Sequence, residues 1–126
     1  MTDEYHFKRS VGMLLLISLC LVGALSTWFS ATVVLSEISI HAKLIKSQEV
    51  WLTNAVQIGF VIGALIIAFF NLSDTISLKI LIALSCAIAG LANLLILWAS
   101  NPVGVIGLRC ITGAALSGVY PPAVKL

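Results

Sequence analysis

One arginine lies inside an apolar stretch where a charge is costly. Arg109 is the only charged residue between positions 80 and 124. An ionisable residue within a membrane-spanning segment usually marks a functional site. An arginine near the end of such a segment can instead extend its guanidinium toward the interface, where it stays hydrated. Both interpretations of Arg109 stay open at this stage, and Arg109 is the first candidate for a functional residue.

Uncharged polar residues form two closely spaced pairs inside other apolar stretches. Ser26 and Ser30 are four residues apart, and Asn54 and Gln57 are three apart. Each pair therefore shares one face of a helix. A buried amide without a hydrogen bond costs several kcal/mol, so these groups must face protein or water. We expect the four side chains either to bond between helices or to line a polar path.

The short polar segment at residues 71–79 carries a carboxylate and an ammonium, on Asp74 and Lys79. Asp74 or Ser77 could cap the helix that follows by accepting backbone N–H bonds. Lys79 could anchor that helix at the membrane interface. A gating role for Asp74 and Lys79 is the functional alternative.

The sequence offers no pattern for metal, cofactor or nucleophilic chemistry. His6 and His41 lie in separate polar segments, and Cys20, Cys86 and Cys110 lie in three different apolar stretches without metal-ligand spacing. We expect the cysteines to be small packing residues and predict no cofactor, no metal and no disulfide. The chain is not expected to be an enzyme.

The elements that position these residues follow from the charge distribution. Hydrophobic residues make up 60% of the chain and charged residues only 10%, which excludes an ordinary soluble domain and a nucleic-acid binder. The charge-free runs are 10–36, 50–73, 80–108 and 110–124. The first three are long enough to span a membrane, and the fourth spans if Arg109 is tolerated. The first run is too long for a signal peptide, so we expect it to be retained.

We therefore predict an all-α integral membrane fold with four antiparallel transmembrane helices. The predicted helices are 11–35, 51–70, 77–99 and 102–123, joined by connections at 36–50, 71–76 and 100–101. Pro102 fits the first turn of the last helix, and Pro121 and Pro122 should end it. Residues 1–10 form a separate N-terminal segment, and residues 11–126 form the membrane part.

Small residues at four-residue spacing indicate close helix packing. Gly59 and Gly63 form one such pair, Gly113 and Ser117 another, and Ala114 and Gly118 a third. Helices in lipid associate through close backbone approach, which small residues permit. We expect Gly59, Gly63, Gly113 and Gly118 to lie at helix contacts.

Basic residues near the helix ends predict the orientation of the chain. An N-terminus inside the cell places four basic residues on the cytoplasmic side, namely Lys8, Arg9, Lys79 and Lys125. Lys43 and Lys46 then lie outside, so the distribution follows the positive-inside rule. We predict a multi-pass protein of the cell (inner or plasma) membrane with a cytoplasmic N-terminus and the lipid bilayer as its main partner.

Two motifs resemble those of the major facilitator superfamily of transporters. The family loop between helices 2 and 3 reads Gly-x-x-x-Asp-x-x-Gly-Arg-Lys/Arg. Residues 70–79 match its acid with Asp74 and its final base with Lys79, whereas Phe70, Ser77 and Leu78 replace the glycines and the arginine. The family also has an arginine followed by a ladder of small residues in helix 4, and residues 109–118 read Arg-Cys-Ile-Thr-Gly-Ala-Ala-Leu-Ser-Gly. Segments 27–32, 51–54 and 120–126 are similar to that family as well.

The resemblance implies part of a six-helix half of a transporter that moves a small solute by alternating access. Carried over by resemblance, Arg109 would serve proton or substrate coupling, and Asp74 would brace an inner gate. The partners would be the solute and further C-terminal helices of a full-length transporter. We expect the 126 residues alone not to transport, because four helices cannot enclose both halves of the path.

Two other functions fit a four-helix membrane chain. A small oligomeric pump would need a carboxylate at mid-membrane for proton exchange, and Glu37, Glu49 and Asp74 all lie at helix ends or in a connection. A scaffold subunit without transport would bind a partner protein and no solute. Neutralising Arg109 separates these functions, since only a transporter loses uptake while it still folds.

Overall fold

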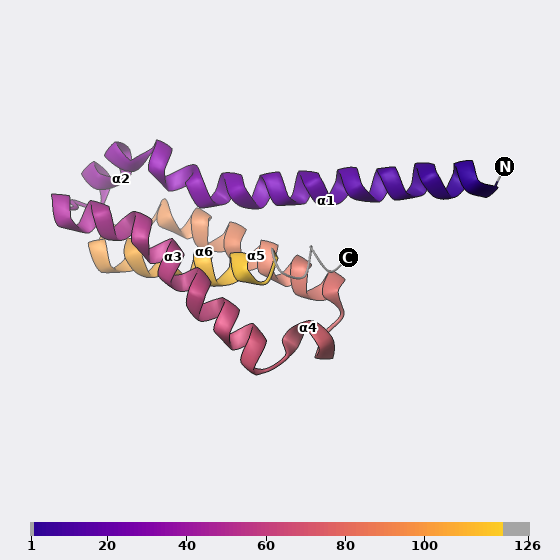
Figure 1. Cartoon of the computed structure of the whole chain (residues 1–126). Coiled ribbons are helices and arrows are strands. Elements are labelled where there is room, and N and C mark those ends of the chain that lie inside the picture. Colours follow the sequence, from indigo (N-terminus) through magenta and orange to yellow (C-terminus); the bar gives the residue numbers. More distant parts are fainter. Residues whose placement is uncertain (1, 120–126) are drawn as a thin grey trace.

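The computed structural model of the chain is built from helices (Figure 1). It describes residues 2–119. The helices in this part are α1 (Thr2–Val33), α2 (Leu35–His41), α3 (Lys46–Phe69), α4 (Leu72–Thr75), α5 (Leu78–Ile96) and α6 (Pro102–Ser117). Successive long helices run in alternating directions (Figure 1).

The first helix is longer than the charge pattern predicts. It begins at Thr2 instead of Val11, and it ends at Val33 instead of Leu35. The polar first turns stay helical, with an ion pair between Lys8 and Glu4 at 2.9 Å, one helical turn apart. Both side chains are largely exposed, so this pair contributes little to stability. Hydropathy marks the part of a helix that lies in lipid, whereas the helix itself can continue into water.

The connection predicted at 36–50 contains the short helix α2. Its apolar side packs inward, where Leu35 and Ile38 lie against a cluster formed by Ala42, Leu52 and other buried residues. A turn follows in which Lys43 adopts a left-handed backbone with φ of 52°. The first helix and α2 are thus separated only by Val34, and the chain folds back over the end of the bundle.

The boundaries of α3 and α5 differ from the predicted ones by a few residues. Helix α3 begins at Lys46, five residues before Trp51, and the Gln48 side chain accepts a bond from the Ile45 N–H at 3.0 Å. Helix α5 begins after Ser77, whose side chain makes no capping hydrogen bond. The connection between them holds the single turn α4, which follows Asn71 in a left-handed conformation.

Helix α6 begins as the sequence predicts. Pro102 occupies its first turn, and the Asn101 side chain accepts a bond from the Gly104 N–H at 2.5 Å. The predicted end near Ala123, together with Pro121, Pro122 and Lys125, lies outside the described residues.

Within residues 2–119, three helices are long and apolar enough to cross a membrane. These segments are Glu4–Ser30, Lys46–Phe69 and Leu78–Ile96. Helix α6, with 16 residues, is shorter and rises about 24 Å against a hydrocarbon core of about 30 Å. The all-α membrane character expected from the sequence therefore rests on three full-length spans and one shorter apolar helix.

Helix α6 is the centre of the bundle, packed between α3 and α5. A Cβ atom added to Gly59 would overlap the carbonyl group of Cys110, and one added to Gly113 would overlap that of Val56. Gly63 lies in the same way against Ala114 on α6. Glycine lets the backbones of α3 and α6 touch here, and no larger residue fits without separating them.

The remaining small residue, Gly118, marks the contact between α6 and α5. A Cβ atom added to Gly118 would overlap the hydroxyl of Ser85. The four small residues singled out in the sequence thus all lie where two helices approach closely.

Helix α1 lies across the bundle and is attached to it over a short stretch (Figure 1). The Trp28 ring packs edge-on against Phe60 of α3, with 5.3 Å between ring centroids. Ala24 and Trp28 also lie against a small buried cluster that contains Ala89 and Leu116. Most of the remaining apolar side chains of α1, such as Leu14 and Leu19, are exposed.

Candidate functional site

Arg109 projects from the central helix α6 toward α1 and α5, and its side chain is buried. Only 1% of the residue is exposed. Its Nη2 atom donates to the Trp28 carbonyl oxygen at 2.8 Å, and Nη1 donates to the Thr27 carbonyl oxygen at 3.4 Å and to Asn93 Oδ1 at 3.3 Å. The guanidinium is therefore held inside the bundle between three helices and is not extended toward the interface.

The partners of this guanidinium are neutral oxygen atoms. Among the described residues no carboxylate forms an ion pair with Arg109, and its Nε atom has no hydrogen-bond partner. A buried charge normally requires both a counter-charge and a full set of hydrogen bonds to offset its lost hydration. The guanidinium thus carries a positive charge into the bundle, and its Nε is the nitrogen atom that has no partner among the described residues.

The three oxygen atoms that accept from the guanidinium are held in place by helices α1 and α5. A helical carbonyl oxygen has a second lone pair beyond the one used in the helix, so Trp28 can accept from Arg109 without breaking α1. The Thr27 carbonyl oxygen also accepts from the Ser30 hydroxyl at 2.9 Å, and its contact with Arg109 is the longer of the two, at 3.4 Å. The Asn93 amide is oriented by its own bond from Nδ2 to the Ala89 carbonyl oxygen at 3.0 Å, one turn earlier on α5. This bond turns Oδ1 toward Arg109.

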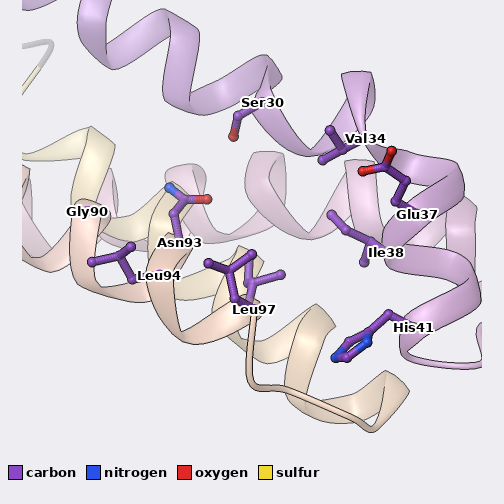
Figure 2. A pocket seen from close by; sticks show the side chains of 10 residues that line it. Ser30, Val34, Glu37, Ile38, His41, Gly90, Asn93, Leu94 and Leu97 are labelled. Carbon is purple, nitrogen blue, oxygen red and sulfur yellow. The ribbon is translucent and has the colours of Figure 1, made fainter.

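A cavity of about 540 Å³ lies next to this arginine, between the end of α1, helix α2 and α5 (Figure 2). Its polar lining consists of Ser30, Glu37, His41 and Asn93, and its remaining walls are apolar. Asn93 belongs both to the cavity lining and to the set of Arg109 partners. The volume falls within the range of small-molecule sites in proteins.

Glu37 and His41 line this cavity from α2. They are four residues apart on α2, so they share a face, and both line the cavity (Figure 2). No hydrogen bond or ion pair joins either side chain to another described residue. Glu49, in contrast, accepts a bond from the Ser39 hydroxyl and does not line the cavity.

The sequence did not indicate that Glu37 and His41 share one face of a helix. Both residues fall in the stretch that was predicted to be a connection. The signal that could have found it is the apolar spacing of Leu35 and Ile38 around Glu37, which is typical of one short amphipathic turn.

The four predicted path-lining residues are divided by the fold. Ser30 lines the cavity, whereas Ser26 is exposed on α1 and donates to the Val22 carbonyl oxygen at 2.9 Å. Asn54 and Gln57 are exposed on α3, on the side opposite to the buried Gly59 that packs against α6. The structure thus does not bring Asn54 and Gln57 to Arg109, and their place in a path stays a prediction.

Asp74 and Lys79 lie at a different end of the molecule from α2 (Figure 1). Asp74 belongs to the single turn α4, and Lys79 is the second residue of α5. Both residues are exposed. They belong to a surface separate from the cavity.

Other chemistry finds little support in the part of the chain that the structure describes. This part holds no group of three or more His, Cys, Asp or Glu residues that could bind a metal ion. Cys20, Cys86 and Cys110 are free thiols. The polar groups present at the site are a guanidinium, a carboxylate, an imidazole, a hydroxyl and an amide, which can form hydrogen bonds and charge contacts.

Comparison with known proteins yields no relative for this chain: no family profile, no curated protein and no solved structure matches it.

Proposed function

We propose that this chain forms the first four transmembrane helices of a secondary transporter similar to the major facilitator superfamily, moving a small solute by alternating access. The observation that carries the proposal is the buried guanidinium of Arg109 next to a cavity with polar lining. Asn93 connects the two, so a solute in the cavity would sense the charge through one amide.

The cost of this charge supports a functional role. A link between α6, α1 and α5 could be made by a neutral amide, without removing a guanidinium from water. Arg109 keeps its charge inside the bundle with neutral acceptors and an unused Nε donor. Ionisable residues inside membrane spans cost free energy to bury, and they commonly belong to solute or ion paths.

The orientation in the membrane is part of the proposal. The N-terminal part of α1, which holds Lys8 and Arg9, and the start of α5, which holds Lys79, lie toward one end of the molecule (Figure 1). The start of α3, which holds Lys46 and follows Lys43, lies toward the other end (Figure 1). The positive-inside rule then favours a cytoplasmic N-terminus in the cell membrane. In this orientation Asp74 and Lys79 would form part of an inner gate, and the cavity lined by Glu37 would lie toward the outer side.

Further helices would have to complete the path. Helix α1 is exposed over most of its length, and Asn54 and Gln57 place two amides on the outer face of α3. Amides within a membrane span need hydrogen-bonding neighbours. We propose that C-terminal helices of a full-length transporter cover these faces.

The first experiment tests whether the cavity is water-filled in the membrane. Cys20, Cys86 and Cys110 are replaced by Ala, and single cysteines are then introduced at Ser30 or Asn93. We expect both new cysteines to react with a membrane-impermeant methanethiosulfonate reagent. A cysteine at Leu91, which is exposed on α5 and does not line the cavity, is the matched control and should stay unreactive. Unreactive cysteines at Ser30 and Asn93 would refute a solute path here.

The second experiment tests the role of Arg109 in transport. Cells that overproduce the full-length protein are compared with cells that produce Arg109→Met, and accumulated solutes are measured by mass spectrometry. A transporter loses the accumulation of a solute while the Met variant still folds and reaches the membrane. Equal accumulation in both cell lines would rule out a coupling role for Arg109.

A scaffold is the second candidate function, and one observation favours it. Every hydrogen bond that Arg109 makes within the described chain ties α6 to α1 or α5. If Arg109 acts only as a clamp, the Met variant loses insertion or binding of a partner protein and changes no solute level.

A further inference from the structure

We infer that the cavity between α1, α2 and α5 binds an organic cation that carries an apolar body, with Glu37 as its counter-charge. This inference rests on the proposed function, because it names the class of solute for the same path. It follows from the charges, the walls and the neighbours of the cavity.

Glu37 places a negative charge in the lining of the cavity. It is the only acidic or fixed basic residue in the lining, and no described residue neutralises it. Glu37 is exposed, but the apolar walls on its cavity side take the place of part of the water that would otherwise screen its charge. His41, four residues later on the same face, adds a ring nitrogen for a hydrogen bond.

The walls favour a solute with an apolar body. Val34 and Ile38 lie on one side of the cavity, and Leu94 of α5 and Leu97, which follows α5, lie on the other (Figure 2). A fully hydrated inorganic cation would leave these walls in contact with water. An alkyl or aryl ammonium ion instead buries its body against them.

Arg109 gives the solute a direction. Its guanidinium lies behind Asn93, with 3.3 Å between Nη1 and Oδ1. A positive charge at this inner end repels the cationic head, so the head stays near Glu37 and the body points toward Asn93. An anionic solute of the same shape would be repelled by the carboxylate of Glu37.

Two probes of opposite charge and similar shape test the inference. Binding of phenethyltrimethylammonium and of 4-phenylbutanoate to the full chain in lipid nanodiscs is measured by isothermal titration calorimetry. We expect saturable binding of the ammonium probe and much weaker binding of the carboxylate. In Glu37→Gln the affinity for the ammonium probe should fall about tenfold or more, the amount expected for a lost charge-assisted contact.

Glu49→Gln is the matched control. It makes the same change at the same end of the bundle, outside the cavity, and glutamine still accepts the bond from Ser39. This variant should bind the ammonium probe like the wild type. Gly90→Leu provides an independent check, because Gly90 lines the cavity and a Cβ added there meets no atom within 4 Å. The leucine should fill the cavity and weaken binding, while the helical circular dichroism stays unchanged.

The outcomes separate this inference from the proposed function. Preferential binding of the carboxylate probe, equal binding by Glu37→Gln and wild type, or no saturable binding of the ammonium probe would overturn the cation assignment. None of these results affects the accessibility of cysteines at Ser30 and Asn93, which tests the path itself.

Discussion

Arg109 combines three hydrogen bonds with a charge that no carboxylate in the described part of the chain neutralises. Its contacts to Thr27, Trp28 and Asn93 are individually favourable, but the guanidinium also loses its hydration. Replacing buried charged groups by apolar residues of similar size is often neutral or stabilising. The balance of these two effects sets the expected behaviour of variants at this position.

We predict that Arg109→Met leaves the folded bundle as stable as the wild type or more stable. Methionine fills most of the same volume and removes the unsatisfied Nε donor. Thermal unfolding in detergent, followed by circular dichroism, measures the change in midpoint. A large drop in the midpoint would show that Arg109 serves mainly as a structural clamp.

We predict that substitution of Asn93 destabilises the protein more than substitution of Arg109, as long as Arg109 is present. In Asn93→Leu the guanidinium loses its only side-chain acceptor among residues 2–119, and we expect a destabilisation of about 1–3 kcal/mol. The double variant Asn93→Leu with Arg109→Met removes both partners and should recover most of this loss. A double-mutant cycle of unfolding free energies measures the coupling, and additive effects would show that the two side chains do not interact.

The identity of Arg109 as a notable residue could be read from the sequence, but its partners could not. Two of the three acceptors are backbone carbonyl oxygens of Thr27 and Trp28, and every residue carries such a group. Their selection depends on how α1 crosses α6. The exposed positions of Asn54 and Gln57 likewise depend on which face of α3 packs against α6.

At the scale of elements, the packing of α3 on α6 depends on a few small residues. Gly59 and Gly113 bring the two backbones into direct contact. Small residues at four-residue spacing predict such a face, because only close approach supplies attraction between helices in lipid. The spacing alone does not identify the partner helix, which the fold shows to be α6 for α3.

We predict opposite effects for two glycine-to-alanine changes. Gly59→Ala places a Cβ into the Cys110 carbonyl and should separate α3 from α6, at a cost of about 1–3 kcal/mol. Gly90→Ala has open space at its Cβ and removes a flexible residue from α5, so it should be neutral or stabilising by up to about 1 kcal/mol. Unfolding of both variants in the same detergent checks this, and equal effects would contradict the packing described for Gly59.

Helix α2 shows where reasoning from hydropathy stops. Its seven residues contain polar Ser36, Glu37 and Ser39 and are too short to give a clear helical period. It is held by tertiary contacts, since Leu35, Ile38 and Ala42 join the cluster with Leu52. The cavity exists only because α2 folds back over α5, and it therefore had no counterpart in the predicted layout.

At the scale of the whole molecule, the basic residues of the described helices other than Arg109 gather toward the two ends. The N-terminal part of α1, with Lys8, and the start of α5, with Lys79, lie toward one end of the molecule, and the start of α3, with Lys46, lies toward the other (Figure 1). The alternation of charge-free runs with short charged segments predicts such an arrangement, because charged side chains do not remain in lipid without a partner. Helix lengths and ends were less predictable, since a helix can extend beyond the lipid.

We predict that single cysteines at Lys8 and Lys79 are labelled from the cytoplasmic side and a cysteine at Lys46 from the outside. The background is the cysteine-free chain, and a membrane-impermeant maleimide is added to intact cells or to inverted vesicles. Labelling of position 46 and position 79 from the same side would contradict the alternating topology.

The attachment of α1 also bears on how the chain is made. Thr27 lies 82 residues before its partner Arg109, and α1 has few other contacts with the bundle. At a synthesis rate of about 5–20 residues per second, Thr27 is synthesised roughly 4–16 s before Arg109. Until Arg109 is made, α1 lacks its hydrogen bonds from α6. Docking of α1 is therefore a late event in biogenesis, and its timing is set by translation of α6.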